Sequence, residues 1–246
     1  MKGVARVIDY LKYIDEMEEQ NIKLSQKHLS QDLQKYELSV NVLVRVLNLI
    51  DKALNVTEGK YLKPESKIAT VLLASRFMVS AKCLFNMIVK GYYYEAWILM
   101  RNLQDNVAYC LCFAESNDYA KLWFKKRLSM RTTLKKVRKV IHPSHRQHLK
   151  NARDFMDDFV HSKMPAVARF VKYEPKPIIR PQERPEFRKD ADVLLRALRT
   201  LNTSMLLILI DIFEKDLNKE TKGTIVTFVR EEQKDLGLQN SLERKT

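Results

Sequence analysis

His161 stands at a spacing that suits proton transfer. It is one of five histidines in the chain and follows Asp157 by one helical turn. A carboxylate at that spacing can accept the ring proton and raise the pKa of the imidazole. Arg153, two turns before His161, offers a guanidinium for a phosphate group. Such a set could cleave RNA, with His161 moving the proton of a 2′-hydroxyl and an arginine stabilising the charged phosphorane. The alternative is a helix end at which Asp157 or Asp158 and the helix dipole stabilise the histidine.

Arg101 and Asp105 form a second charged pair, four residues apart inside an apolar stretch, and Arg76 lies in the apolar stretch before it. Charges in such surroundings must be paired or must face a cleft. Arg101 could therefore neutralise a bound phosphate next to His161. The alternative is an ion pair within one helix that fixes its packing.

The net charge of +14 is concentrated in one part of the chain. Residues 121–150 hold eleven Lys or Arg and no Asp or Glu, whereas the first 64 residues hold ten basic and nine acidic side chains. The run favours an anionic partner such as nucleic acid over a merely solvated helix face. A membrane surface is a rival partner, disfavoured because the apolar stripe of this segment is needed for the core. The candidate nucleic-acid-binding residues are Lys125, Lys126, Arg127, Arg131, Lys135, Lys136, Arg138, Lys139, Arg146 and, from the N-terminal region, Arg45.

No pattern indicates a metal ion or a cofactor. His142, His145 and His148 are three residues apart, but the nearby Lys and Arg side chains repel a cation. There is no glycine-rich phosphate loop and no zinc spacing of cysteines. The three cysteines lie in apolar helical segments and are expected to be buried thiols of a reducing compartment. With no recognisable signal peptide, we expect a cytoplasmic protein that does not contact a membrane.

The elements that must position these residues are expected to be helices, because 246 residues include only five glycines. Residues 1–64 are predicted to form a small unit with helices over 4–17, from Ser25 and from Ser39, where each serine serves as an N-cap. A hairpin is predicted around Thr57–Lys60. The stretch 24–50 resembles a winged helix-turn-helix, which would present Asn41, Arg45 and Asn48 to DNA or to a protein. The near-neutral charge of the unit argues against strong DNA binding.

Residues 65–222 are predicted to form a helical bundle. The expected helices span about 66–90, ended by Gly91, then 94–114, 118–140, 144–162 and 189–217. The proline-rich segment 172–189 is expected to be an extended loop. Residues 223–246 are expected to form a polar C-terminal tail.

The bundle resembles HEPN-like proteins of bacteria over residues 66–215. The features that carry the resemblance are Arg76 in a long apolar helix, a Gly-Tyr-Tyr turn at Gly91, the Arg101–Asp105 spacing, and a later helix ending in Phe-Val-His at His161. The signature of the family is an arginine, often followed by a polar residue, then four to six residues and a histidine. Here seven residues separate Arg153 from His161.

The resemblance implies an all-α bundle, commonly a homodimer, and metal-independent RNase activity in a toxin–antitoxin or phage-defence system. Together with the charge pattern above, it makes His161, Arg101, Asp105, Arg153 and Asp157 the candidate catalytic residues, and it implies an antitoxin or other acidic protein as a further partner. Our interpretation is therefore an RNA-binding protein or endoribonuclease of all-α fold. The alternatives are a non-enzymatic nucleic-acid-binding or regulatory module, and a scaffold whose basic face docks an acidic protein.

Overall fold

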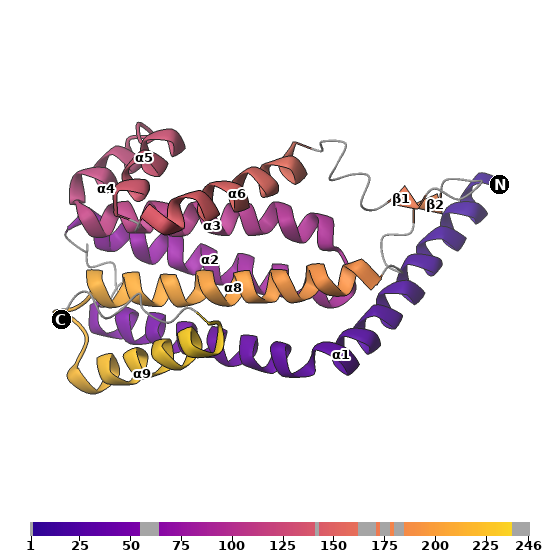
Figure 1. Ribbon diagram of the computed structural model, residues 1–246, viewed down its shortest axis with the longest axis horizontal. Coiled ribbons are helices and arrows are strands. Elements are labelled where there is room, and N and C mark those ends of the chain that lie inside the picture. Colours follow the sequence, from indigo (N-terminus) through magenta and orange to yellow (C-terminus); the bar gives the residue numbers. More distant parts are fainter. Residues whose placement is uncertain are drawn as a thin grey trace.

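The protein is all-α, as the sequence predicts (Figure 1). The computed structural model describes the backbone of residues 2–54, 64–140, 143–161, 171–172, 178–179 and 185–237, and the side chains of 12–52, 64–139, 150–158, 160–161 and 189–237. The helices are α1 (Lys2–Leu54), α2 (Glu65–Lys90), α3 (Tyr93–Glu115), α4 (Asn117–Phe124), α5 (Met130–Val140), α6 (Pro143–Val160), α8 (Pro185–Ile212) and α9 (Lys219–Asp235). The short strands β1 (Val171–Lys172) and β2 (Ile178–Ile179) pair antiparallel within the segment that the sequence assigns to an extended loop.

The N-terminal region is one helix, and the prediction of three separate helices is wrong. Residues 2–54 contain no proline and only one glycine, Gly3, so nothing interrupts the helix once it has formed. Ser25 and Ser39, predicted to be N-caps, lie buried inside α1. Ser25 Oγ donates a hydrogen bond to Val89 O at 3.0 Å, and Ser39 Oγ accepts one from Asn202 Nδ2. Both serines therefore join α1 to other helices. The hairpin predicted after α1 lies outside the described residues.

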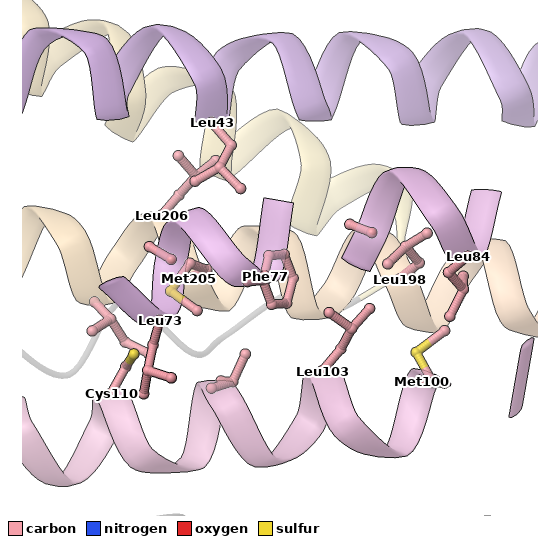
Figure 2. Packing of buried hydrophobic residues seen from close by; sticks show 14 of the residues in the cluster. Leu43, Leu73, Phe77, Leu84, Met100, Leu103, Cys110, Leu198, Met205 and Leu206 are labelled. Atoms are coloured by element: carbon pink, nitrogen blue, oxygen red, sulfur yellow. The ribbon is translucent and has the colours of Figure 1, made fainter. Parts of the chain in front are cut away.

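The core lies where α1, α2, α3 and α8 meet. Figure 2 shows Leu43 of α1 pointing toward Leu206 of α8, with Phe77 of α2 among the core side chains. All three side chains are fully buried. Because α2 is covered on one side by α1 and α8 and on another by α3 and α4, it is apolar around most of its circumference. Gly91 ends α2 with a φ of 89°, the left-handed conformation that its lack of a Cβ permits.

The segment predicted as one helix over 118–140 is divided into α4 and α5. Lys126 adopts a φ of 55°, which no helix residue can have, and Leu128 turns into the core. Ser129 then accepts a hydrogen bond at Oγ from the backbone N–H of Thr132 at 3.1 Å, which is the geometry of an N-cap. The corner between the two helices brings the basic residues of both to the upper left of Figure 1.

Residues 223–235, predicted to belong to a polar tail, form most of α9. Asn218 begins this helix by accepting a hydrogen bond from the backbone N–H of Thr221 at 2.8 Å. Ile225, Phe228 and Val229 are buried at helical spacing, so α9 packs against α8 as part of the bundle.

Two helical stretches, Glu65–Lys90 and Lys189–Ile212, are long and apolar enough to cross a membrane by length and composition alone. Both supply buried side chains to the core of the bundle, as core helices of soluble proteins do. The expectation of a cytoplasmic protein without membrane contact stays a prediction.

Candidate functional site

Four of the five predicted catalytic residues meet in one cluster between α3 and α6. Arg101 Nε donates to Asp157 Oδ1 at 2.7 Å, and Arg153 Nη1 donates to Asp105 Oδ1 at 2.8 Å. Arg101 also contacts Asp105 within α3. Each helix thus supplies an arginine followed four residues later by an aspartate. Because the early residue of one helix pairs with the late residue of the other, α3 and α6 cross antiparallel. We call these residues the Arg–Asp cluster.

Burial decides the electrostatics of the Arg–Asp cluster. The side chains of Arg101 and Arg153 are only 11% and 12% exposed, and those of Asp105 and Asp157 are 25% and 32% exposed. Burial raises the pKa of the Asp105 carboxyl above its usual range, although the charge of Arg101 acts in the opposite direction. Two guanidinium and two carboxylate groups balance, so the cluster has no net charge. To bind a phosphate, Arg101 or Arg153 must first break its contact with an aspartate, and the phosphate then takes the place of that carboxylate.

Aromatic and apolar contacts hold α6 against α3 beside the cluster. The rings of Trp97 and Phe155 meet edge to face, with centroids 5.0 Å apart, and Met156 is buried. These contacts fix the backbone from which Arg153 and Asp157 extend. The Arg–Asp cluster therefore rests on a packed helix crossing.

His161 lies apart from the cluster. Its side chain is exposed directly after the end of α6, and its backbone N–H donates to the carbonyl oxygen of Asp157 at 3.0 Å. Among the described residues, no hydrogen bond or ion pair joins the imidazole to the Asp157 carboxylate, which instead contacts Arg101. The structure therefore shows the Asp157–His161 spacing without the ring contact that the sequence predicts.

A second charged feature is formed by α4, α5 and the corner between them. The following basic side chains there are exposed, and none forms an ion pair with another residue that the structure describes: Lys125, Lys126, Arg127, Arg131, Lys135, Arg138 and Lys139. We call these seven residues the basic surface. Phe124, at the end of α4, is 43% exposed beside it. An exposed aromatic ring next to cationic groups can stack on a nucleotide base.

Three of the predicted nucleic-acid-binding residues are not part of this surface. Lys136 is half-buried and paired with Glu115 at 3.0 Å. Arg45 is exposed, but α1 lies on the other side of the bundle from α5 in Figure 1. It is separated from the basic surface because α2 and α3 lie between α1 and α5. The side chain of Arg146 lies outside the described residues.

No group of three His, Cys, Asp or Glu residues with the geometry of a metal site occurs in the part of the chain that the structure describes. The side chains of His142, His145 and His148 lie outside that part. Cys110 and Cys112 are buried, and burial raises the pKa of the Cys112 thiol to about 11. Cys83 is exposed, contrary to the expectation of three buried thiols, because it lies on the outer face of α2.

Sequence reasoning missed a buried ion pair between α8 and α9. Arg199 donates from Nε and Nη2 to the two carboxylate oxygens of Glu232, at 2.9 and 3.0 Å, and both side chains are at most 7% exposed. Asp235 also accepts from Arg199 at 2.7 Å. Asn218 could have revealed part of this pair, because an asparagine before an apolar pattern predicts the start of a helix, and that helix carries Glu232.

Comparison of the chain with protein-family models, with curated proteins and with solved structures finds no match. The Arg–Asp cluster and the basic surface are therefore the two features of the molecule that bear on its function.

Proposed function

We propose that the protein binds single-stranded RNA through the basic surface of α4 and α5. The observation that carries the proposal is the exposure of seven Lys and Arg side chains on a segment without a single acidic residue from 121 to 150. A surface of unpaired cations attracts a polyanion, because binding a phosphate backbone releases the counterions of both partners. Nothing in the fold requires this excess of charge, since the core of the bundle is apolar.

Phe124 favours a single strand over a duplex. Its ring is 43% exposed between Lys121 and Lys125 in the sequence and contacts Trp123 edge to face at 5.2 Å. Bases of a single strand are free to stack on such a ring, whereas the bases of a duplex already stack on one another. RNA is chosen over DNA because short sequence motifs within residues 66–215 resemble those of HEPN-like proteins, many of which act on RNA.

Fluorescence anisotropy with a labelled single-stranded RNA tests this function. The variant Lys135→Glu/Arg138→Glu reverses two exposed charges on α5 and should weaken binding by about tenfold or more. The slope of log affinity against log salt concentration should become about 1.4 less steep, as two phosphate contacts are lost. The matched control is Lys215→Glu/Arg230→Glu, which reverses one exposed charge in the turn before α9 and one on α9. Absence of binding by the wild type, or equal loss in both variants, contradicts the proposal.

A second candidate function is metal-independent RNA cleavage, favoured by the exposed imidazole of His161 one turn after Asp157. In this mechanism His161 takes the proton of a 2′-hydroxyl, the 2′-oxygen attacks the adjacent phosphorus, and the bond to the 5′-oxygen breaks to leave a 2′,3′-cyclic phosphate. The 5′-oxygen takes a proton from water, and Arg101 or Arg153 leaves its aspartate to stabilise the phosphorane. The neutral, paired state of the Arg–Asp cluster makes binding without cleavage the first choice. A cleavage assay in the presence of a chelator distinguishes the two. Cleavage that persists with chelator and is abolished by His161→Ala, while RNA affinity is unchanged, supports the enzyme.

A further inference from the structure

One face of α1 carries large apolar side chains that the bundle does not cover. Tyr13, Leu24, Leu38 and Leu49 are 46%, 51%, 56% and 42% exposed. They are 11, 14 and 11 residues apart, close to whole numbers of helical turns, so all four lie within about 40° of one another around the helix axis. Leu43, which packs into the core, points about 120° away from this line. We call the four residues the α1 stripe.

The spacings between the residues of the α1 stripe are symmetric about its centre. Gln31 is at its centre, seven residues from both Leu24 and Leu38 and eighteen from both Tyr13 and Leu49. A second α1 helix laid antiparallel, with a two-fold axis at Gln31, therefore places Leu24 opposite Leu38 of the second copy. It also places Tyr13 opposite Leu49. A surface that matches itself under a two-fold rotation has the geometry of a homodimer interface.

Charges beside the α1 stripe match in the same register. Glu16 and Arg45 are exposed on one flank of the stripe, and antiparallel pairing brings each next to the opposite charge of the second copy. Parallel pairing places this flank of the two copies on opposite sides of the interface, so Glu16 and Arg45 gain no such partner there. On the other flank, Lys35 is neutralised by Asp235 of its own chain at 2.6 Å. The charges thus favour the antiparallel arrangement.

We propose that the protein forms a homodimer in which two copies of α1 pair antiparallel along the α1 stripe. The contact runs for about 54 Å of helix between Tyr13 and Leu49. Pairing removes all four exposed apolar side chains from water at once. The exposed apolar residues of α2, Leu72 and Val79, are only seven residues apart and span about 10 Å of helix, so they offer a much shorter contact. This inference does not depend on RNA binding.

Sedimentation equilibrium of the full chain measures the dimer. The wild type should show a concentration-dependent monomer–dimer equilibrium, and Leu38→Asp should raise the dissociation constant by at least about tenfold. Leu38 is more than half exposed, so this variant keeps its fold, which circular dichroism verifies. The matched control is Val79→Asp, the same kind of change at an exposed site on α2, and it should leave the dimer intact. A monomeric wild type, or a dimer that Leu38→Asp does not weaken, overturns the proposal.

Cysteine cross-linking tests the register in a Cys83→Ser background, which removes the exposed native thiol. A mixture of Leu24→Cys chains with Leu38→Cys chains should give disulfide-linked pairs of one chain of each kind. Linked pairs of Leu24→Cys alone indicate parallel helices and overturn the arrangement. Arg45→Glu and Glu16→Arg should each weaken the dimer, and their combination should restore it. Failure of the combination to restore association also counts against the antiparallel register.

Discussion

Arg101 of α3 holds Asp157 of α6 through a hydrogen bond of 2.7 Å across 56 residues of chain. The side chain of Arg101 is only 11% exposed and also contacts Asp105, so its guanidinium depends on these two carboxylates for hydrogen bonds. This contact makes the Arg–Asp cluster a structural element of the bundle as well as a candidate site.

Replacing Arg101 should therefore destabilise the fold. Arg101→Leu leaves the carboxylates of Asp105 and Asp157 without their shared cation, and we expect the free energy of unfolding to fall by about 2 kcal/mol. Urea denaturation measures the change. The double variant Arg101→Leu/Asp157→Leu should regain part of the loss, since it removes one of the stranded charges. Arg196→Leu, which removes an exposed arginine of α8, serves as the control and should have little effect.

The raised pKa of Asp105 predicts a pH dependence with a defined sign. The carboxyl binds its proton more tightly in the folded than in the unfolded chain, because burial raises its pKa above the ordinary 3.8. Its contribution to stability is fully present below that ordinary value and is lost as the pH rises through the folded pKa. Asp105→Asn has no such loss. The stability of the variant relative to the wild type should therefore increase as the pH rises above about 4 in denaturation experiments. A difference that stays flat or decreases with pH contradicts this reading of the cluster.

The buried pair of Arg199 and Glu232 should be essential for the attachment of α9. Glu232→Ala leaves the guanidinium buried with only Asp235 as an acidic partner, and we expect a loss of about 3 kcal/mol in the free energy of unfolding. Thermal and urea denaturation both report it. The neighbouring Glu231 is exposed, so Glu231→Ala should leave stability almost unchanged. Equal losses of unfolding free energy at the two positions would show that α9 as a whole, and not this ion pair, determines the stability.

The corner between α4 and α5 contains a strained backbone at Lys126. Its φ of 55° is costly for any residue with a Cβ, so Lys126→Gly should stabilise the protein by about 0.5 kcal/mol. Lys125 has a φ of −79° and gains nothing from glycine, so Lys125→Gly should be neutral or destabilising. Melting temperatures of the two variants, each lacking one positive charge, give the comparison directly.

Helices that end at strong local signals were predictable from the sequence. Gly91 and the apolar pattern on each side of it predicted α2 and α3 to within a few residues. Ser25 and Ser39 led to a wrong prediction because a serine before an apolar run is a good N-cap and also a good contact between helices. Only the position of Val89 and Asn202 in the folded chain distinguishes these two roles. The break at Lys126 was missed because no glycine or proline marks it.

The part of the candidate site that depends on one helix alone was also predictable from the sequence. The four-residue spacing placed Arg101 and Asp105 together, since it depends only on the geometry of one helix. The contact of this pair with Arg153 and Asp157 depends on how α3 and α6 pack, which no local pattern encodes. His161 was predicted to contact Asp157, but the stronger attraction of the carboxylate to Arg101 takes that partner away. The RNA-binding function itself stays a prediction.

The contact between Ser39 and Asn202 joins residues 163 positions apart. During synthesis α1 and α2 are made early, yet the α8 side chains that cover them, such as Leu206, come more than 100 residues later. At ribosomal rates this interval is roughly ten to thirty seconds, during which the apolar surfaces of α1 and α2 that α8 covers lack that partner. The nascent chain is therefore expected to be a client of chaperones that act at the ribosome, and to be released only after α8 has been translated.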